Sequence, residues 1–289
     1  MSPVSGDRVV VRYLLDTGAA TDVIGRLVAD GDPVVVERDG TEHVIARSAI
    51  VAMKTVPPRP VRASEIRSLD LARARGWLSL EHAWVDGWFC RAAPGVPGNR
   101  ATCAAPLHPD ASLDRLDGPR AWFAERGVPL RLTVSDRLIR GAPPLDQPTD
   151  VLTGPAAAGP ADGVGLADGP DTGWLSLVGT PASLVTAVDG AVRFASIVDG
   201  GATVAAGRVA ITADAAGNMW GGIGSVTVAP SHRRQGLATR VMAALGAAAA
   251  EAGASRVYLE VVRDNDAAHA LYRGLGFTVH HGYGYWTES

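Results

Sequence analysis

The sequence predicts a mixed α/β protein preceded by a small all-β domain, and three patterns support this prediction. Residues 6–60 hold short runs of β-branched residues separated by turn sequences such as DTGA and DGDP. Residues 63–153 and 174–289 each alternate segments with helical and strand patterns. The stretch between them, 154–173, is rich in Pro, Gly, Ala and Asp, which predicts a linker. The alternation predicts a sheet that is covered by helices.

The first domain, residues 1–60, is expected to form a small β-barrel. Its β-branched runs predict five short strands within about 55 residues, a spacing typical of small barrels. The sequence PPRP at 57–60 ends the regular structure, because proline lacks an N–H donor and restricts the residue before it. We therefore expect a domain boundary near 60–63.

The two later parts show a similar order of elements. Residues 63–153 predict a helix over 65–83, strand structure in the aromatic stretch 83–93, a helix over 113–127 and a strand over 128–134. In the last part the patterns predict a strand at 174–179, a short helix or turn at 182–190, paired strands at 191–212 and a strand at 219–230. A helix at 233–254, a strand at 255–262, a helix at 266–275 and a strand at 283–288 follow. Two related α/β halves, 63–153 and 174–289, are therefore expected behind the barrel.

The bulk composition excludes several classes of protein. The formal net charge is −3, which argues against a general nucleic-acid or membrane-surface binder. No run approaches the roughly 20 apolar residues of a membrane span, and the start MSPVSGDRVV lacks a signal-peptide pattern, so a cytoplasmic protein is expected. Cys90 and Cys103 fit neither a disulfide framework nor a zinc pattern, so two buried thiols and no metal are expected.

The helix start in RRQGLA, residues 233–238, has features of a phosphate-binding turn. A helix start carries unpaired N–H groups and a partial positive charge. Gly236 allows a ligand to approach the backbone closely, and Arg233 and Arg234 add positive charge. These features favour binding of a pyrophosphate. The glycine and lysine spacing of a P-loop and the three spaced glycines of a dinucleotide fingerprint are absent. The alternative is a basic helix start exposed to solvent.

A second unusual stretch, LEVVRDNDAAHALYRGLGF, spans 259–277. It predicts a buried strand, a charged turn and a helix that Asn265 or Asp266 caps. Tyr272 follows Asn265 by seven residues, or two helical turns, so both side chains can lie on one side of the helix. For a lone tyrosine, the alternative is a half-buried packing residue.

Together the two stretches resemble the GNAT superfamily of acetyl-CoA-dependent N-acetyltransferases. The shared pattern is a strand ending in Pro, then Arg-x-x-Gly-x-Ala and a helix, then LEVxxxNxxAxxLYxxLGF. It covers roughly 217–278 and extends over 172–289. The resemblance implies a mixed central sheet with helices on both faces. Residues 63–153 resemble a diverged GNAT half of tandem, actinobacterial-type enzymes, and 6–56 resembles the SH3-like barrel in front of some of them.

The resemblance also implies roles for individual residues. Backbone groups of the strand at 226–228 would pair with the pantetheine arm of acetyl-CoA, and N–H groups of the next turn would bind its pyrophosphate. Asn265 would bond the pantetheine, the Val228 N–H would face the oxyanion, and Tyr272 would protonate the leaving thiolate. The implied acetyl-CoA-binding residues are Val226, Thr227, Val228, Arg233, Arg234, Gln235, Gly236, Leu237, Ala238, Thr239, Asn265 and Tyr272.

The general base is the open part of this interpretation. The strand before the turn reads GGIGS over 221–225, so the carboxylate that many relatives carry there is absent. Glu260 matches a glutamate of LEV-type members and could act directly or through water, or it could only order the site. His280 and His281 could line the pocket or lie on the surface. Four residues of the first half could wall the acceptor pocket or be ordinary packing: Trp84, Trp88, Phe89 and Asn99.

The expected function is transfer of an acetyl group from acetyl-CoA directly to an amine. The acceptor could be a small molecule, a protein N-terminus or a lysine. The alternative is a non-catalytic CoA-binding sensor or partner-binding protein, in which the barrel is the interaction module. The first half lacks the Arg-x-x-Gly-x-Gly/Ala turn, so we expect only the second half to bind CoA productively.

Overall fold

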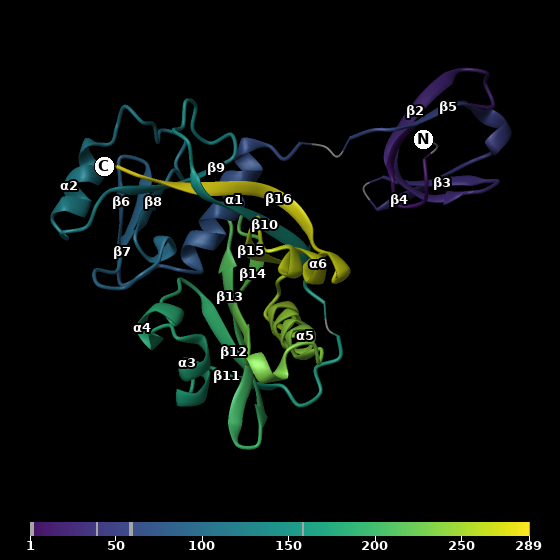
Figure 1. The fold of residues 1–289 in the computed structure, drawn as a ribbon. Coiled ribbons are helices and arrows are strands. Elements are labelled where there is room, and N and C mark those ends of the chain that lie inside the picture. The colour runs from purple at the N-terminus through teal and green to yellow at the C-terminus, as the bar shows by residue number, and fades with distance from the viewer. Residues whose placement is uncertain (1–2, 39, 58–59, 158, 289) are drawn as a thin grey trace. The chain divides into compact units, whose positions relative to one another are not determined.

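A computed structural model of the chain describes residues 3–38, 40–57, 60–157 and 159–288 (Figure 1). The chain divides into two compact units, Met1–Pro60 and Val61–Ser289. Within the PPRP segment where the boundary was predicted, Pro58 and Arg59 lie outside the described residues.

The first unit is an antiparallel sheet of five strands. Hydrogen bonds connect them in the order β4-β3-β2-β1-β5. Alternate side chains pack on one face into a small core that includes Val9, Val11 and Leu27. The strands are β1 Arg8–Leu14, β2 Ala20–Asp30, β3 Val34–Arg38, β4 Thr41–Ile45 and β5 Ile50–Thr55.

The predicted barrel is wrong in one respect, because this sheet does not close. Closure requires hydrogen bonds between the two edge strands. In the described part of the unit, β4 pairs with β3 and β5 pairs with β1, and no ladder joins β4 to β5. A single 3-10 turn, Arg47–Ala49, carries the chain from one edge to the other. The strand pattern alone does not specify whether the edges meet.

The second unit is built on one sheet of eleven strands. Their order is β11-β12-β13-β14-β15-β10-β16-β9-β8-β7-β6, and only the neighbours β14/β15 and β8/β9 are parallel. The strands are β6 Glu81–Val85, β7 Trp88–Ala92, β8 Cys103–Ala105, β9 Arg131–Ser135, β10 Asp146–Pro155, β11 Gly165–Ala167, β12 Ala191–Asp199, β13 Ala202–Ala213, β14 Met219–Val228, β15 Arg256–Val262 and β16 Thr278–Thr287.

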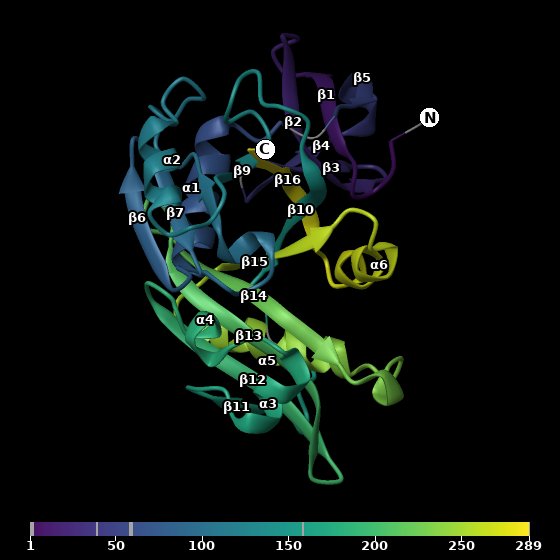
Figure 2. The same cartoon turned by 60° about the vertical axis from the view of Figure 1, so that its left-hand side comes forward.

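Helices cover both faces of this sheet, as the sequence predicts. Figures 1 and 2 show α5 on one face of β12–β14, and α3 and α4 on the opposite face. Helix α1 lies on the same face as Tyr258, whose hydroxyl donates to the Ala72 carbonyl. The helices are α1 Ala63–Arg75, α2 Asp117–Ala124, α3 Thr172–Val178, α4 Ala182–Val185, α5 Leu237–Glu251 and α6 Asp266–Gly274, with 3-10 turns η2 Asn99–Ala101 and η3 Pro230–His232.

The two α/β parts exchange their last strands. β10 ends the first part, yet it pairs with β15 of the second. β16 ends the second part, yet it pairs with β9 of the first. β10 and β16 also pair with each other at the centre of the sheet. The parts at 63–153 and 174–289 therefore share one sheet.

Three stretches differ from the sequence predictions. The helix predicted over 65–83 ends at Arg75, and β6 begins at Glu81. Residues 174–179 form most of a helix, α3, because Asp171 accepts a hydrogen bond from the Trp174 N–H at 2.7 Å and Gly179 ends the helix in the left-handed conformation. The expected linker holds the end of β10, the strand β11 and the start of α3.

Glycines on β14 allow the two faces to pack closely. A Cβ at Gly222 would lie 2.2 Å from the hydroxyl oxygen of Tyr258 and 2.5 Å from its ring carbon Cζ. Tyr258 is buried under α1, so its ring has little room to move. At Gly224 the nearest atom to such a Cβ is 4.0 Å away.

We expect Gly222→Ala to lower the free energy of unfolding by roughly 1–3 kcal/mol, because the methyl group overpacks the Tyr258 ring. Urea unfolding followed by tryptophan fluorescence measures the change. Gly224→Ala is the matched control and should leave stability within about 0.5 kcal/mol of wild type. Equal stability of the two variants would show that the ring yields to the added methyl group.

Candidate active site

Strands β14 and β15 diverge at the centre of the second unit. Their parallel pairing covers Trp220–Gly222 opposite Arg256–Tyr258. Beyond Gly222, β14 continues to Val228 along β13, while β15 continues to Val262 along β10. A bulge in the β13–β14 ladder accompanies Ser225, whose φ is 56°. One edge of residues 223–228 is therefore left without a strand partner in the described structure, as the resemblance implied.

The turn after β14 leads directly into helix α5. The chain passes η3 and then takes left-handed conformations at Arg234 (φ 65°) and Gly236 (φ 77°). The first helical hydrogen bond of α5 runs from the Arg240 N–H to the Gly236 carbonyl at 3.1 Å. The first N–H groups of a helix have no partner within it, and a backbone that curls in this way forms an anion-binding concavity.

The side chains of this turn are mostly exposed. Arg233, Arg234 and Gln235 are exposed, while Leu237 is buried in the core beneath α5. Ala238 and Thr239 are half-buried. The sequence-predicted residues 233–239 therefore lie together, next to the open end of β14.

Helix α6 places the other two predicted residues. Asn265 caps it, and its Oδ1 accepts a hydrogen bond from the Ala268 N–H at 3.1 Å. Tyr272 is half-buried, with its ring 5.9 Å from that of Phe277. Burial raises the pKa of Tyr272, so its hydroxyl stays protonated at neutral pH.

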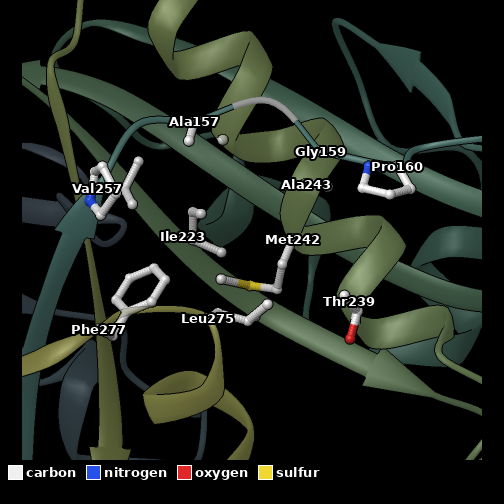
Figure 3. A pocket seen from close by; sticks show the side chains of 12 residues that line it. Ala157, Gly159, Pro160, Ile223, Thr239, Met242, Ala243, Val257, Leu275 and Phe277 are labelled. Carbon is white, nitrogen blue, oxygen red and sulfur yellow. The ribbon is translucent and has the colours of Figure 1, made fainter.

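An apolar pocket of about 180 Å³ lies between α5, the end of α6 and the segment after β10 (Figure 3). Ile223, Met242 and Phe277 point into it, and Thr239 lies at its border. The pocket touches both the first unpaired residue of β14 and the start of α5. Sequence analysis missed this pocket, because Pro155, Ala157, Gly159 and Pro160, which line one side, were interpreted as linker.

A network of charged groups lies on the opposite face of β15. Glu260 accepts hydrogen bonds from Arg73 Nε at 3.0 Å and from the Tyr283 hydroxyl at 2.8 Å, and Arg100 Nη2 lies 3.3 Å from its carboxylate. Burial alone would raise the pKa of Glu260, but Arg100 and Arg73 outweigh it and lower the pKa to about 2. Glu260 is therefore ionised and fully engaged.

Asp70 extends this network to β9 and β16. It forms an ion pair with Arg73 and accepts hydrogen bonds from the Ser135 hydroxyl at 2.6 Å and from His281 Nε2 at 3.1 Å. Burial opposes ionisation, yet Arg73 and His281 hold the pKa of Asp70 well below its usual range. His281 is thus a buried structural residue.

His280 lies half-buried beside His281, with the two Nδ1 atoms 2.8 Å apart. Burial and the neighbouring His281 lower the pKa of His280 to about 4, so it is neutral at pH 7. Neither histidine lines the apolar pocket between α5 and α6.

The four candidates from the first α/β part do not form one wall. Trp88 and Phe89 are buried in two different core clusters, whereas Trp84 is 54% exposed. Asn99 donates a hydrogen bond to Gln147 Oε1 at 3.0 Å. Trp84 and Phe89 line a pocket of about 360 Å³ with their ring centroids 5.4 Å apart, so the ordinary packing interpretation holds for Trp88.

The neighbouring residue Arg100 was missed, and it does reach the opening. Its guanidinium carbon lies 4.7 Å from the centroid of the Trp77 ring, and Nη1 lies 4.0 Å from the position of a Cβ at Gly224. No motif marks Arg100 in the sequence; its place depends on the shared sheet.

Within the described residues, no three His, Cys, Asp or Glu side chains gather in a way that could hold a metal ion. In the same part of the chain, no helix is both long and apolar enough to cross a membrane. The two cysteines are free and buried, and burial raises the pKa of the Cys90 thiol to about 12.

Two protein families match the chain. The family described as "Probable histone acetyltransferase Rv0428c C-terminal" matches residues 63–286. The family described as "Rv0428c N-terminal Sm-like domain" matches residues 3–54, so the N-terminal domain that resembled an SH3-like barrel is Sm-like.

Individual relatives agree with these matches. "Probable histone acetyltransferase Rv0428c" of Mycobacterium tuberculosis (strain ATCC 25618 / H37Rv) is 34% identical over 292 residues, covering 96% of this chain and 94% of that protein. "Uncharacterized N-acetyltransferase YobR" of Bacillus subtilis (strain 168) is 39% identical over 59 residues, covering 20% of this chain and 24% of that protein.

A solved structure supports the fold. A GCN5-related N-acetyltransferase from Kribbella flavida has a TM-score of 0.56 at 18% identity, covering 78% of this chain and 95% of that chain. The family matches, the full-length relative and this shared fold lead to one conclusion. The chain belongs to the Rv0428c family of GNAT acetyltransferases, with an Sm-like domain in front of the acetyltransferase region.

Proposed function

We propose that the protein transfers an acetyl group from acetyl-CoA directly to an amine, within a ternary complex. One observation carries this proposal: the unpaired edge of β14 leads straight into the curled, Arg-rich start of α5. An extended polar chain that ends in a pyrophosphate fits such a combination, because the strand edge offers backbone partners and the helix start attracts phosphate.

The acetyl-CoA contacts follow from this arrangement. Backbone groups of Val226 and Val228 pair with the pantetheine arm as if it were an added strand. N–H groups from Arg234 to Thr239 bind the pyrophosphate, and the positive charge of Arg233 supports them. The Asn265 Oδ1 caps α6, so its amide NH₂ is the group that binds the pantetheine.

The chemical step forms a C–N bond and breaks a C–S bond. The neutral amine attacks the thioester carbonyl, and the tetrahedral oxyanion accepts a hydrogen bond from the Val228 N–H. Collapse of this intermediate expels the CoA thiolate. Tyr272 donates its phenolic proton to that sulfur, the nitrogen loses a proton to water, and water returns a proton to the Tyr272 phenolate. Burial keeps the Tyr272 hydroxyl protonated, which suits a proton donor.

Glu260 suits the ordering role better than the role of a general base. A base must accept a proton, but the pKa of Glu260 is lowered to about 2, and both carboxylate oxygens accept hydrogen bonds. We propose that Glu260 holds Arg73, Arg100 and Tyr283 in place, and that the amine enters the site already neutral.

The acceptor is an amine of one of three classes. The name of the Mycobacterium tuberculosis relative mentions histone, which suggests a protein lysine as one acceptor. A small-molecule amine and a protein N-terminus are the other two classes. Calorimetric titration with acetyl-CoA, followed by thiol release across a panel of these three classes, tests the proposal. Acetyl-CoA binding with acceptor-dependent thiol release is expected, and no binding would overturn it.

We expect Tyr272→Phe to lower kcat about 100-fold, because the thiolate then leaves without a proton donor. The affinity for acetyl-CoA should change less than about threefold, since the ring beside Phe277 is retained. Thiol release and calorimetry measure the two quantities. Tyr13→Phe, in the Sm-like domain, is the matched control and should keep wild-type turnover. Wild-type turnover of Tyr272→Phe would remove this residue from the chemical step.

We expect Glu260→Gln to destabilise the fold by about 3 kcal/mol at pH 7, because the folded pKa of Glu260 is about 2 against an ordinary value of 4.5. A lowered folded pKa stabilises above pH 4.5, and this contribution is lost as the pH falls towards 2. The difference in the free energy of unfolding between wild type and Glu260→Gln should therefore be smaller at pH 3 than at pH 7. Urea unfolding at both pH values measures it.

Glu251→Gln, at the exposed end of α5, is the control for the loss of a glutamate charge and should match wild type at both pH values. If Glu260→Gln lowers the free energy of unfolding by the same amount at pH 7 and pH 3, the proposed ordering role of Glu260 is contradicted.

A further inference from the structure

The network around Glu260 contains more positive than negative charge. Two carboxylates belong to it, Asp70 and Glu260, and both are buried or nearly so. Four guanidinium groups surround them: Arg73, Arg91, Arg100 and Arg208.

Two of these arginines bind carbonyl groups instead of carboxylates. Arg208 is 2% exposed and donates to the Val185 and Gly76 carbonyls, while its Nε has no partner. Arg91 donates to the Trp77 carbonyl at 3.0 Å and, through Nε, to Cys103 Sγ at 3.3 Å. In the part of the chain that the structure describes, no carboxylate forms an ion pair with either arginine. Burial and the nearby Arg100 lower the pKa of Arg208 to about 9, as expected for a guanidinium without a counter-charge.

The surplus of positive charge favours the binding of an anion that is not part of the chain. Buried charges in proteins are normally paired, because an unpaired charge loses its hydration without compensation. The narrow pocket bordered by Arg73, Arg91, Arg100 and Glu260 has about 20 Å³, which is room for a water molecule but not for a carboxylate. The anion must therefore bind where the network meets solvent.

Arg100 is where the network meets solvent. Its side chain is 31% exposed, against 11% for Arg73 and 11% for Glu260. Trp77 and Glu260 fix its guanidinium, and Nη1 faces the β14 backbone at Gly224. A fixed, half-exposed guanidinium can bind a carboxylate through two parallel hydrogen bonds.

Arg100 also lies on the face from which an acceptor would enter. Val257 and Leu259 face the core beneath α5, the side assigned to acetyl-CoA. Strand alternation puts Tyr258 and Glu260 on the other face, where Arg100 binds. The donor would fill one side of the opening, so the amine would arrive from the side of Arg100.

We propose that Arg100 binds a carboxylate of the acceptor, and that the acceptor is a small amino acid whose carboxylate lies close to its amine. This inference rests on the proposed function and names its substrate class. The carboxylate pairs with Arg100 and balances part of the charge of Arg208 and Arg91 behind it. A lysine-rich peptide would bring further positive charge to the same face.

The test compares amino acids with their carboxamides as acceptors in the full-length protein. We expect wild type to prefer the amino acid of a matched pair by about 10–100-fold in kcat/KM, the range of one charged hydrogen-bond pair. Arg100→Gln should bring this ratio close to one, while the affinity for acetyl-CoA stays unchanged. Arg115→Gln, an exposed arginine of the same α/β part, is the control and should keep the ratio.

A second measurement covers the case in which Arg100→Gln is inactive. A carboxylate without an amine should inhibit wild type in competition with the acceptor, and calorimetry should detect it on acetyl-CoA-loaded wild type but not on acetyl-CoA-loaded Arg100→Gln. Three results would overturn this inference but not the proposed function. They are a wild-type kcat/KM ratio near one, a preference for a lysine peptide, and an equal loss of kcat/KM for the amino acid and its carboxamide in Arg100→Gln. If no acceptor of any class supports thiol release, the proposed function is overturned together with this inference.

Discussion

The hydrogen-bond ladders of β10 and β16 are the constraint on which the rest of the second unit depends. Val151 of β10 lies opposite Glu260 on one side and opposite His281 on the other. These two pairings bring β15, β16 and α1 to one place, so Asp70, Arg73, Glu260 and Tyr283 meet there, although they lie up to 213 residues apart. The ion pairs strengthen this junction, but the strand exchange creates it.

The two sides of the opening differ in how their residues are brought together. The side proposed for the CoA pyrophosphate is local: the end of β14, the turn and the start of α5 follow one another within about 15 residues of sequence. The opposite side is assembled from α1, η2, β15 and β16, which are distant in the chain. The first α/β part thereby contributes Arg73 and Arg100 to the site without a CoA-binding turn of its own.

The same difference decides what could be predicted. The strand and helix order at 219–275 and the mixed sheet were predictable, because turns, caps and apolar periodicity are local signals. The proposed residues 226–228 and 233–239 came from a short motif that resembles the family. Arg100 and the apolar pocket were not predictable, because long-range pairing alone places them. The helix at 172–178 was missed because Trp and Val favour strands, while the Asp171 cap and the Gly179 stop determined the outcome. Whether the Sm-like sheet closes depends on pairing between its two edge strands, and a pattern of β-branched residues does not specify that pairing.

The strand exchange has a consequence for the covalent chain between β10 and β11. If the peptide were cut there, the amino-terminal piece would keep β10 but lack β16, and the carboxy-terminal piece would keep β16 but lack β10. Each piece would expose three strand edges that only the other can cover. The two pieces should therefore depend on each other for folding, and a pair of split fragments would report on their own reassembly.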